Sequence, residues 1–380
     1  MTIVNRKNNN FSLITGEIFF LIKPLILMSV GLIVMLFAGG HLLGFISGLT
    51  FCLLSLFLLR AQHKQFYTLK VKNNSDRVNF PDNSFSENSF TENQVSGESK
   101  SADRDRANWI EKMAPQEKKN LDLSDSSLVL VDLSNLELTS VNFSRAYLSG
   151  SNLDGANLKY TRLESANLSD AQLVNANLSD AKLTGANLSS VNCTRANLRH
   201  ANLKNSNISS ATLNHAQLIG ANLSEANLTG INLVGAKLNY ANLNGVYLWN
   251  GDLRNAQLVG ADLSNAYISS GKFISANLSD ATVKNAQLSC AKFKDSELKN
   301  ANFSGSELIG ANFKNANLEN ANFENANLRN ANFEGANLTG VNFKDADLRF
   351  VKIDGVKEID PKWLSVWEKA NNLEVQEANT

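Results

Sequence analysis

The chain has 380 residues, of which 43% are hydrophobic, and its 36 basic residues are balanced by 36 acidic ones. This balance excludes the basic stripe of a nucleic-acid-binding protein. The three cysteines, Cys52, Cys193 and Cys290, do not have the spacing of a disulfide framework or a metal motif. We therefore expect no disulfide, no metal and no other cofactor.

Residues 1–16 are an N-terminal tail, and residues 17–60 are almost wholly apolar. The segment contains two runs, each close to the length of about 20 residues that crosses a bilayer as a helix. Only Gly39, Gly40 and His41 separate them, so the sequence predicts a transmembrane helical hairpin. Lysine and arginine lie on both flanks and avoid the turn, which by the positive-inside rule places both termini in the cytoplasm. The lipid bilayer is then one partner of this two-span protein.

Three other interpretations of the apolar segment remain open: a cleaved signal peptide, a single tilted span and a buried soluble helical hairpin. Gly40, Gly44 and Gly48 recur every four residues and so lie on one helical face, which favours close approach of another helix. The simpler explanation is that glycine is common in membrane helices and at turns.

Residues 61–120 are mostly polar, with few aliphatic side chains and no period. Such a composition is typical of a flexible tether. At its end, Trp109 and Ile110 are candidates for closing the first coil of the segment that follows.

From residue 121 to 353 every fifth residue is large and apolar, and the residue two positions earlier is small, most often alanine. We call these the central and the small position. A period of five fits neither an amphipathic helix nor a flat strand, so the chain must turn once in every repeat. The second position after each centre is often glycine, asparagine or aspartate, which tolerate the positive φ of a turn.

The unit is clearest in Ala311–Asn320, which reads A-N-F-K-N-A-N-L-E-N. In this the chain resembles the pentapeptide-repeat family. The resemblance implies an all-β solenoid, a right-handed quadrilateral β-helix with about 47 pentapeptides in about twelve coils. It also implies that central and small residues point inward and the other three outward. We therefore expect Leu228→Asp to be strongly destabilising and Asn227→Asp to be nearly neutral.

Residues 354–380 are predicted to form a C-terminal capping helix and tail. Asp360 has the character of an N-cap and Pro361 suits the first helical position. Trp363, Val366, Trp367 and Ala370 then share one helical face, which we expect to cover the last coil.

The outer wall offers one candidate binding site. Tyr247 and Tyr267 are one coil apart in the same column, and Trp249 lies beside Tyr247. Tyrosine and tryptophan are favoured anchors of protein interfaces. The simpler explanation is a ladder of stacked rings with no partner. His200 and His215 fall on different corners without an acidic or cysteine partner, so we expect no catalytic site and no enzymatic activity.

These observations favour a membrane-anchored, non-enzymatic scaffold or protein-interaction module that presents a cytoplasmic rod. One or more proteins are expected as partners, and no nucleic acid. One alternative is a DNA-mimicking regulator of a type II topoisomerase; the family members that do this are strongly acidic, whereas this chain is neutral. A second alternative is an accessory component of a membrane transport or lipid-export system.

Overall fold

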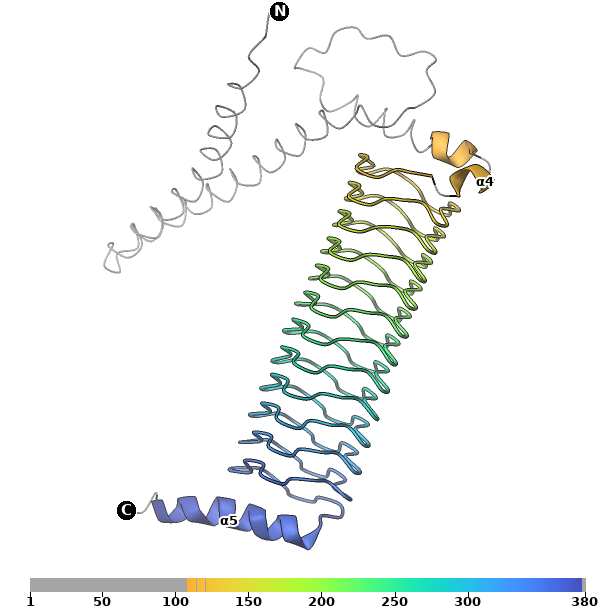
Figure 1. The fold of residues 1–380 in the computed structure, drawn as a ribbon. Helices are drawn as coiled ribbons and strands as arrows, with labels where there is room; N and C mark the ends of the chain where they lie inside the picture. The colour runs from red at the N-terminus through yellow and green to blue at the C-terminus, as the bar shows by residue number, and fades with distance from the viewer. Residues whose placement is uncertain (1–107, 114, 120, 378–380) are drawn as a thin grey trace, which may run out of the picture. The chain divides into compact units, whose positions relative to one another are not determined.

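The computed structural model describes residues 108–113, 115–119 and 121–377. Residues 121 onward wind into a straight stack of similar coils, with helix α4, Pro115–Lys118, at the N-terminal end and helix α5, Pro361–Glu377, at the C-terminal end (Figure 1). Within these residues no helix has both the length and the apolar character needed to cross a membrane. The predicted hairpin at 17–60 and its Gly40, Gly44 and Gly48 lie outside the described residues.

Each coil is built from four pentapeptides. The residue just before each centre, here the bridging position, pairs in parallel with the residue twenty positions later, from Asp122↔Asn142 to Asn337↔Lys357. Backbone hydrogen bonds run both ways between neighbouring coils: Leu123 N donates to Asn142 O at 2.7 Å, and Asn142 N donates to Leu121 O at 2.9 Å. The spacing of twenty confirms the predicted four-sided β-solenoid.

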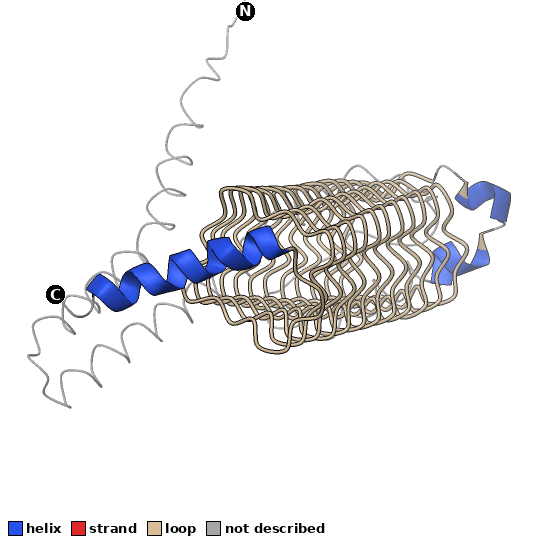
Figure 2. Ribbon diagram, turned by 90° about the horizontal axis from the view of Figure 1, so that it is seen from below, coloured by secondary structure: helices blue, strands red, loops and turns tan. Residues whose placement is uncertain are grey.

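The two residues after each centre, here the first and second turn positions, form the corners. The second turn position has positive φ in every repeat, from Asp125 at 59° to Gly355 at 65°. Because a corner comes every five residues, each side keeps a single bridging residue. The described residues therefore contain isolated bridges and no extended strand, and Figure 2 draws the coils as loops and turns.

The central and small positions fill the interior almost without exposure; Leu228 and Ala226, for example, are fully buried. In the C-terminal third the central phenylalanines stack in two facing columns. Consecutive rings of one column are 4.9 to 5.5 Å apart, and rings across the axis meet edge to face at 5.6 to 6.0 Å. The columns consist of Phe273, Phe293, Phe313 and Phe333 on one side and Phe303, Phe323 and Phe343 on the other. This arrangement is the one that the twenty-residue register predicts.

Asparagine at the bridging position does more than face solvent. Asn227 Oδ1 accepts hydrogen bonds from Thr229 N at 3.1 Å and Thr229 Oγ1 at 2.7 Å. Its Nδ2 donates to Asn207 Oδ1 at 3.2 Å, and similar amide pairs recur along the same wall. Asn227→Asp would remove that donor and set a carboxylate against the Asn207 oxygen. These hydrogen bonds revise the expectation of a nearly neutral substitution, and we now expect Asn227→Asp to lower the free energy of unfolding by about 1 kcal/mol.

Helix α5 closes the C-terminal end. Asp360 caps it, because its Oδ1 accepts the Lys362 N–H at 3.0 Å. Trp363, Trp367 and Ala370 pack on the core, and the Trp363 ring meets Phe343 edge to face at 6.1 Å. Val366 was expected on the same face but is 39% exposed. The reason is that the two tryptophans, four residues apart, fill the contact, which leaves the position between them turned toward solvent.

The N-terminal end also begins with helical turns, at residues 108–112 and in α4. Ile110 is buried in the core cluster and Trp109 packs against it, as candidates for closing the first coil should. The polar stretch predicted as a tether to residue 120 thus includes ordered helical turns from residue 108 onward.

Candidate functional site

The charged side chains of the solenoid are unevenly distributed among its four sides. One side carries the central residues Leu148, Leu168 and so on at intervals of twenty. Over the eight coils from Tyr147 to Cys290, the three outward positions per coil of this side contain one charged residue, Asp170 at a corner. We call this surface the neutral face. Its bridging positions are mostly asparagine and tyrosine, and its first turn positions are mostly serine.

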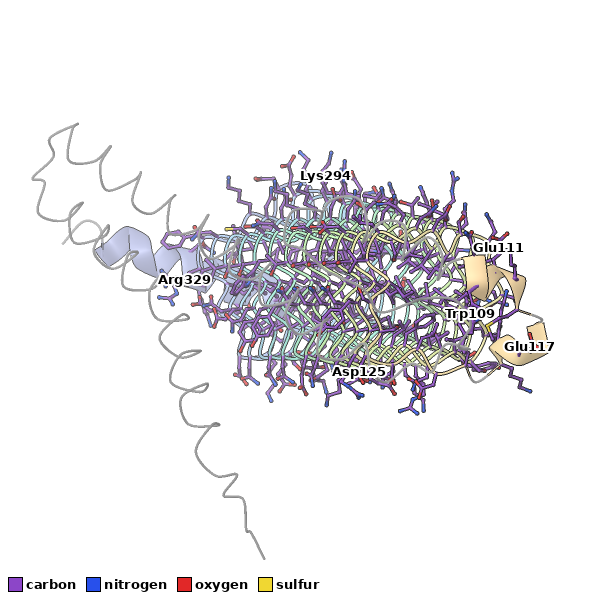
Figure 3. All side chains as sticks on the ribbon, turned by 90° about the horizontal axis from the view of Figure 1, so that it is seen from above. Trp109, Glu111, Glu117, Asp125, Lys294 and Arg329 are labelled. Carbon is purple, nitrogen blue, oxygen red and sulfur yellow. The ribbon has the colours of Figure 1, made fainter. Side chains whose placement is uncertain are left out.

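The other three sides are charged over the same coils. Their cations include Arg162, Lys182 and Lys204 on one side, Arg254 and Lys272 on the next, and Lys159, Arg199 and Lys237 on the third. Several charges are paired, including Arg254 with Asp252 at 2.8 Å and Lys204 with Glu225 at 3.3 Å. Figure 3 shows such side chains, for example Lys294, projecting from the stack. The lack of charged side chains is therefore specific to one side of the solenoid.

The predicted aromatic site lies on the neutral face, and the structure brings its three members together. The Tyr247 and Tyr267 rings stack at 5.0 Å with 6° between their planes. Trp249 meets the Tyr247 ring edge to face at 6.1 Å. All three remain exposed, at 42% for Tyr247, 46% for Trp249 and 40% for Tyr267. We call these three residues the aromatic patch.

The orientation of these rings decides what the aromatic patch can present. Because one face of each tyrosine ring is covered by the other ring, the stacked pair offers a partner ring edges and hydroxyls more than open faces. Edges with hydroxyls suit a protein surface, which supplies both apolar contact and hydrogen-bonding groups.

Exposed aromatic rings elsewhere on the solenoid are isolated. Tyr160 is 51% exposed and Tyr240 is 70% exposed, both at second turn positions on another side. Lys159 Nζ lies 4.6 Å from the centre of the Tyr160 ring. Neither tyrosine has a ring partner among the residues that the structure describes, which makes both useful controls for the aromatic patch.

The histidines and cysteines of the solenoid, which are the candidates for catalysis or metal binding, do not come together. His200 and His215 occupy second turn positions on different corners. Cys193 is buried at a central position, where burial, with a smaller effect of Asp154, raises the pKa of its thiol to about 12; Cys290 is exposed on a corner. Within the described part of the chain, no three histidine, cysteine or acidic residues are placed to hold a metal ion.

The repeated pentapeptide identifies the family to which the chain belongs. A model described as pentapeptide repeats (8 copies) matches residues 119–155, 151–189, 186–224, 216–255 and 241–280, and a model described as a pentapeptide repeat region matches residues 276–353. Together they cover the whole solenoid. The chain belongs to the pentapeptide-repeat family.

Solved pentapeptide-repeat structures resemble this chain. HetL from the cyanobacterium Nostoc sp. strain PCC 7120, described as involved in heterocyst differentiation regulation, is 31% identical, with 61% of this chain and 89% of HetL covered and a TM-score of 0.24. QnrB1, a plasmid-mediated fluoroquinolone resistance protein, is 20% identical, with 60% and 91% covered and a TM-score of 0.26. A pentapeptide-repeat protein of the Arabidopsis thaliana thylakoid lumen is 21% identical, with 33% and 70% covered and a TM-score of 0.17.

No curated protein matches the chain. Because the TM-scores are low, the superpositions carry no functional argument. Membership of the pentapeptide-repeat family thus rests on the repeat and its register, and it implies the fold rather than an activity.

Proposed function

We propose that this pentapeptide-repeat protein is a membrane-anchored, non-enzymatic scaffold whose solenoid binds partner proteins through the neutral face. The observation that carries the proposal is the aromatic patch of Tyr247, Trp249 and Tyr267. It is an exposed cluster of typical interface anchors on a surface where approaching protein meets almost no charge that would need desolvation.

The anchoring part of the proposal rests on residues 17–60. Their two apolar runs and basic flanks favour a hairpin with both ends in the cytoplasm. Reporters fused before Phe11 and after Lys72 test this topology. We expect both to report the cytoplasm, and a signal from the opposite side of the membrane at the second fusion would contradict the hairpin.

The binding part is tested by replacing the three aromatic residues of the patch with serine in the full-length chain. The rings point outward, so the solenoid should fold as before, which circular dichroism would check. Loss of clustered anchors typically weakens binding by about 2 kcal/mol or more. Proteins captured with the parent chain should therefore be depleted from the triple variant in a quantitative pulldown.

The matched control is the pair Tyr160→Ser and Tyr240→Ser, which removes exposed tyrosines from another side of the same solenoid. This control should retain every partner that the parent chain captures. If the triple variant retains them too, the patch is only a stacked ladder and recognition lies elsewhere.

A further inference from the structure

The neutral face differs from the other sides in the hydrogen-bonding character of its side chains. Asparagine, serine, threonine and tyrosine each both donate and accept hydrogen bonds, whereas lysine and arginine only donate and ionised carboxylates only accept. A surface composed of the first kind is complementary to itself. A surface composed of the second kind needs a partner of opposite charge.

Symmetry makes this difference important. When two copies associate about a two-fold axis, each residue near the axis meets a residue from the same stretch of the other copy. On the charged sides this would bring cations such as Lys182 and Lys272 toward their own counterparts, with a repulsive cost. Between Tyr147 and Cys290 the neutral face presents only Asp170 as a charge, at its corner, so two copies meet there without such repulsion.

The aromatic patch supplies the attraction that a neutral surface otherwise lacks. A two-fold axis near the coils of Tyr247 and Tyr267 brings together two patches, and hence six exposed rings, four of which carry a hydroxyl. Aromatic side chains clustered at the centre of a contact carry most of the binding energy of typical interfaces.

The area of the neutral face suits a weak contact between two copies. The eight coils of the neutral face, about 4.8 Å apart, make a face about 38 Å long and roughly 10 Å wide. Two such faces bury on the order of 800 Å² in total, which is the size of a weak, transient contact. An interface of this size is consistent with a dimer that dissociates in the micromolar range.

From these observations we propose that the partner of the neutral face is a second copy of this chain, bound face to face about a two-fold axis at the aromatic patch. The proposal builds on the binding surface described under Proposed function and names its occupant. The neutral face then serves self-association, and the three charged sides remain outward for other molecules.

Sedimentation equilibrium of the purified full-length chain in density-matched detergent tests the proposal. We expect a monomer–dimer equilibrium for the parent and at least about a 30-fold higher dissociation constant when Tyr247, Trp249 and Tyr267 are replaced by serine. The control Tyr160→Ser with Tyr240→Ser should dimerise like the parent. A monomeric parent at about 100 µM, or equal constants for the parent and the triple variant, would overturn the proposal.

A charge-pair experiment tests the two-fold geometry. Ser269 lies on the neutral face next to the patch, and its hydroxyl makes no hydrogen bond with the residues that the structure describes. Ser269→Lys and Ser269→Glu should each lower self-association at least about tenfold, because each places like charges near the axis. A mixture of the two variants should form heterodimers. Ser279→Lys, at the same turn position on the opposite side, is the matched control and should leave dimerisation unchanged.

The outcomes separate this proposal from the broader one. If the triple variant loses other captured proteins while the parent is monomeric, the neutral face is a binding surface for those proteins and the dimer is excluded. If the variants at Ser269 dimerise as the parent does, the contact between copies lies outside the neutral face and the proposal is likewise excluded.

Discussion

At the residue scale, glycine at the second turn position has two separate roles. It accepts the positive φ that every repeat requires, and at several corners it also leaves room for the side chain one coil earlier. A Cβ on Gly220 would lie 2.6 Å from Nδ1 of His200, whereas a Cβ on Gly230 would come no nearer than 3.8 Å to Ser210 Oγ. The two glycines have nearly equal φ, 66° and 68°.

Gly220→Ala and Gly230→Ala therefore separate backbone strain from crowding. Both substitutions should lower the free energy of unfolding by about 1 kcal/mol, because alanine is strained in the left-handed conformation. Gly220→Ala should lower the free energy of unfolding by about a further 1 to 3 kcal/mol, because the imidazole of His200 must move. Thermal melts would measure the difference, and adding His200→Ala should bring Gly220→Ala back to the level of Gly230→Ala. Equal melting points for the two single variants would contradict the crowding.

A second residue with a specific role is Ser306. Its hydroxyl donates to Val283 O at 2.6 Å and accepts from Ala286 N at 3.0 Å. In other repeats the two equivalent backbone groups are hydrogen-bonded directly to each other, as Ala276 N is to Phe273 O at 3.0 Å. Ser296, by contrast, donates to Phe293 O at 2.6 Å beside an intact turn bond. The Ser306 hydroxyl thus takes the place of a backbone contact.

Ser306→Ala should destabilise the chain by about 1 to 3 kcal/mol, because it leaves a buried donor and acceptor without partners. Ser296→Ala is the matched control and should cost less, about 1 kcal/mol, since Phe293 O keeps its backbone donor. Chemical denaturation of the two variants would show this order. The reverse order would mean that the turn at Val283 closes by itself once the hydroxyl is removed.

At the scale of elements, helix α5 replaces a missing coil. In every inner coil, the carbonyl of a small position accepts a backbone N–H from the coil above. At the last coil, Trp363 Nε1 donates to Val341 O at 2.8 Å and Trp367 Nε1 donates to Val351 O at 2.9 Å. Asn371 Oδ1 accepts from Phe350 N at 2.9 Å. The helix thereby satisfies backbone groups that would otherwise form an open β edge.

Trp367→Phe tests this capping role, because phenylalanine keeps a buried ring but has no donor for Val351 O. We expect a loss of about 1 to 2 kcal/mol and earlier hydrogen exchange in the last coil. Val366→Ala changes an exposed neighbour on the same helix and should have little effect. If both variants melt like the parent, the helix covers the end only through apolar contact.

At the scale of the whole solenoid, stability comes from contacts between neighbouring coils, since a single coil cannot offset the entropy of ordering its residues. Those contacts are not uniform along the stack. Phe313 meets four other rings, two stacked and two edge to face. Phe143 is equally buried but has no ring partner among the described residues. The C-terminal third should therefore be the most stable part.

Phe313→Leu should cost about 1 to 3 kcal/mol more than Phe143→Leu, because both remove the same atoms but only the first breaks aromatic pairs. Native-state hydrogen exchange should show the slowest amides between residues 293 and 333 in the parent, with that protection reduced mainly by Phe313→Leu. Uniform protection along the stack would show that the aromatic columns add nothing beyond burial.

Much of this molecule can be deduced from its sequence, because a period of five leaves no freedom of register. The inward positions, the aromatic columns, the positive φ at the corners and the Asp360 cap follow from counting. The grouping of Tyr247, Trp249 and Tyr267 follows from the same count. Even the neutral face is visible once the residues are aligned every twenty.

Tertiary structure alone decided the features that depend on side-chain direction. It turned the Tyr247 and Tyr267 rings face to face, so that their edges point outward, and it aimed the Trp363 and Trp367 donors at carbonyls of the last coil. It also drew the Ser306 hydroxyl into a neighbouring turn. The physical reason is that a repeat fixes which column a residue occupies, whereas the rotamer and hydrogen-bond partner depend on the coil above and below.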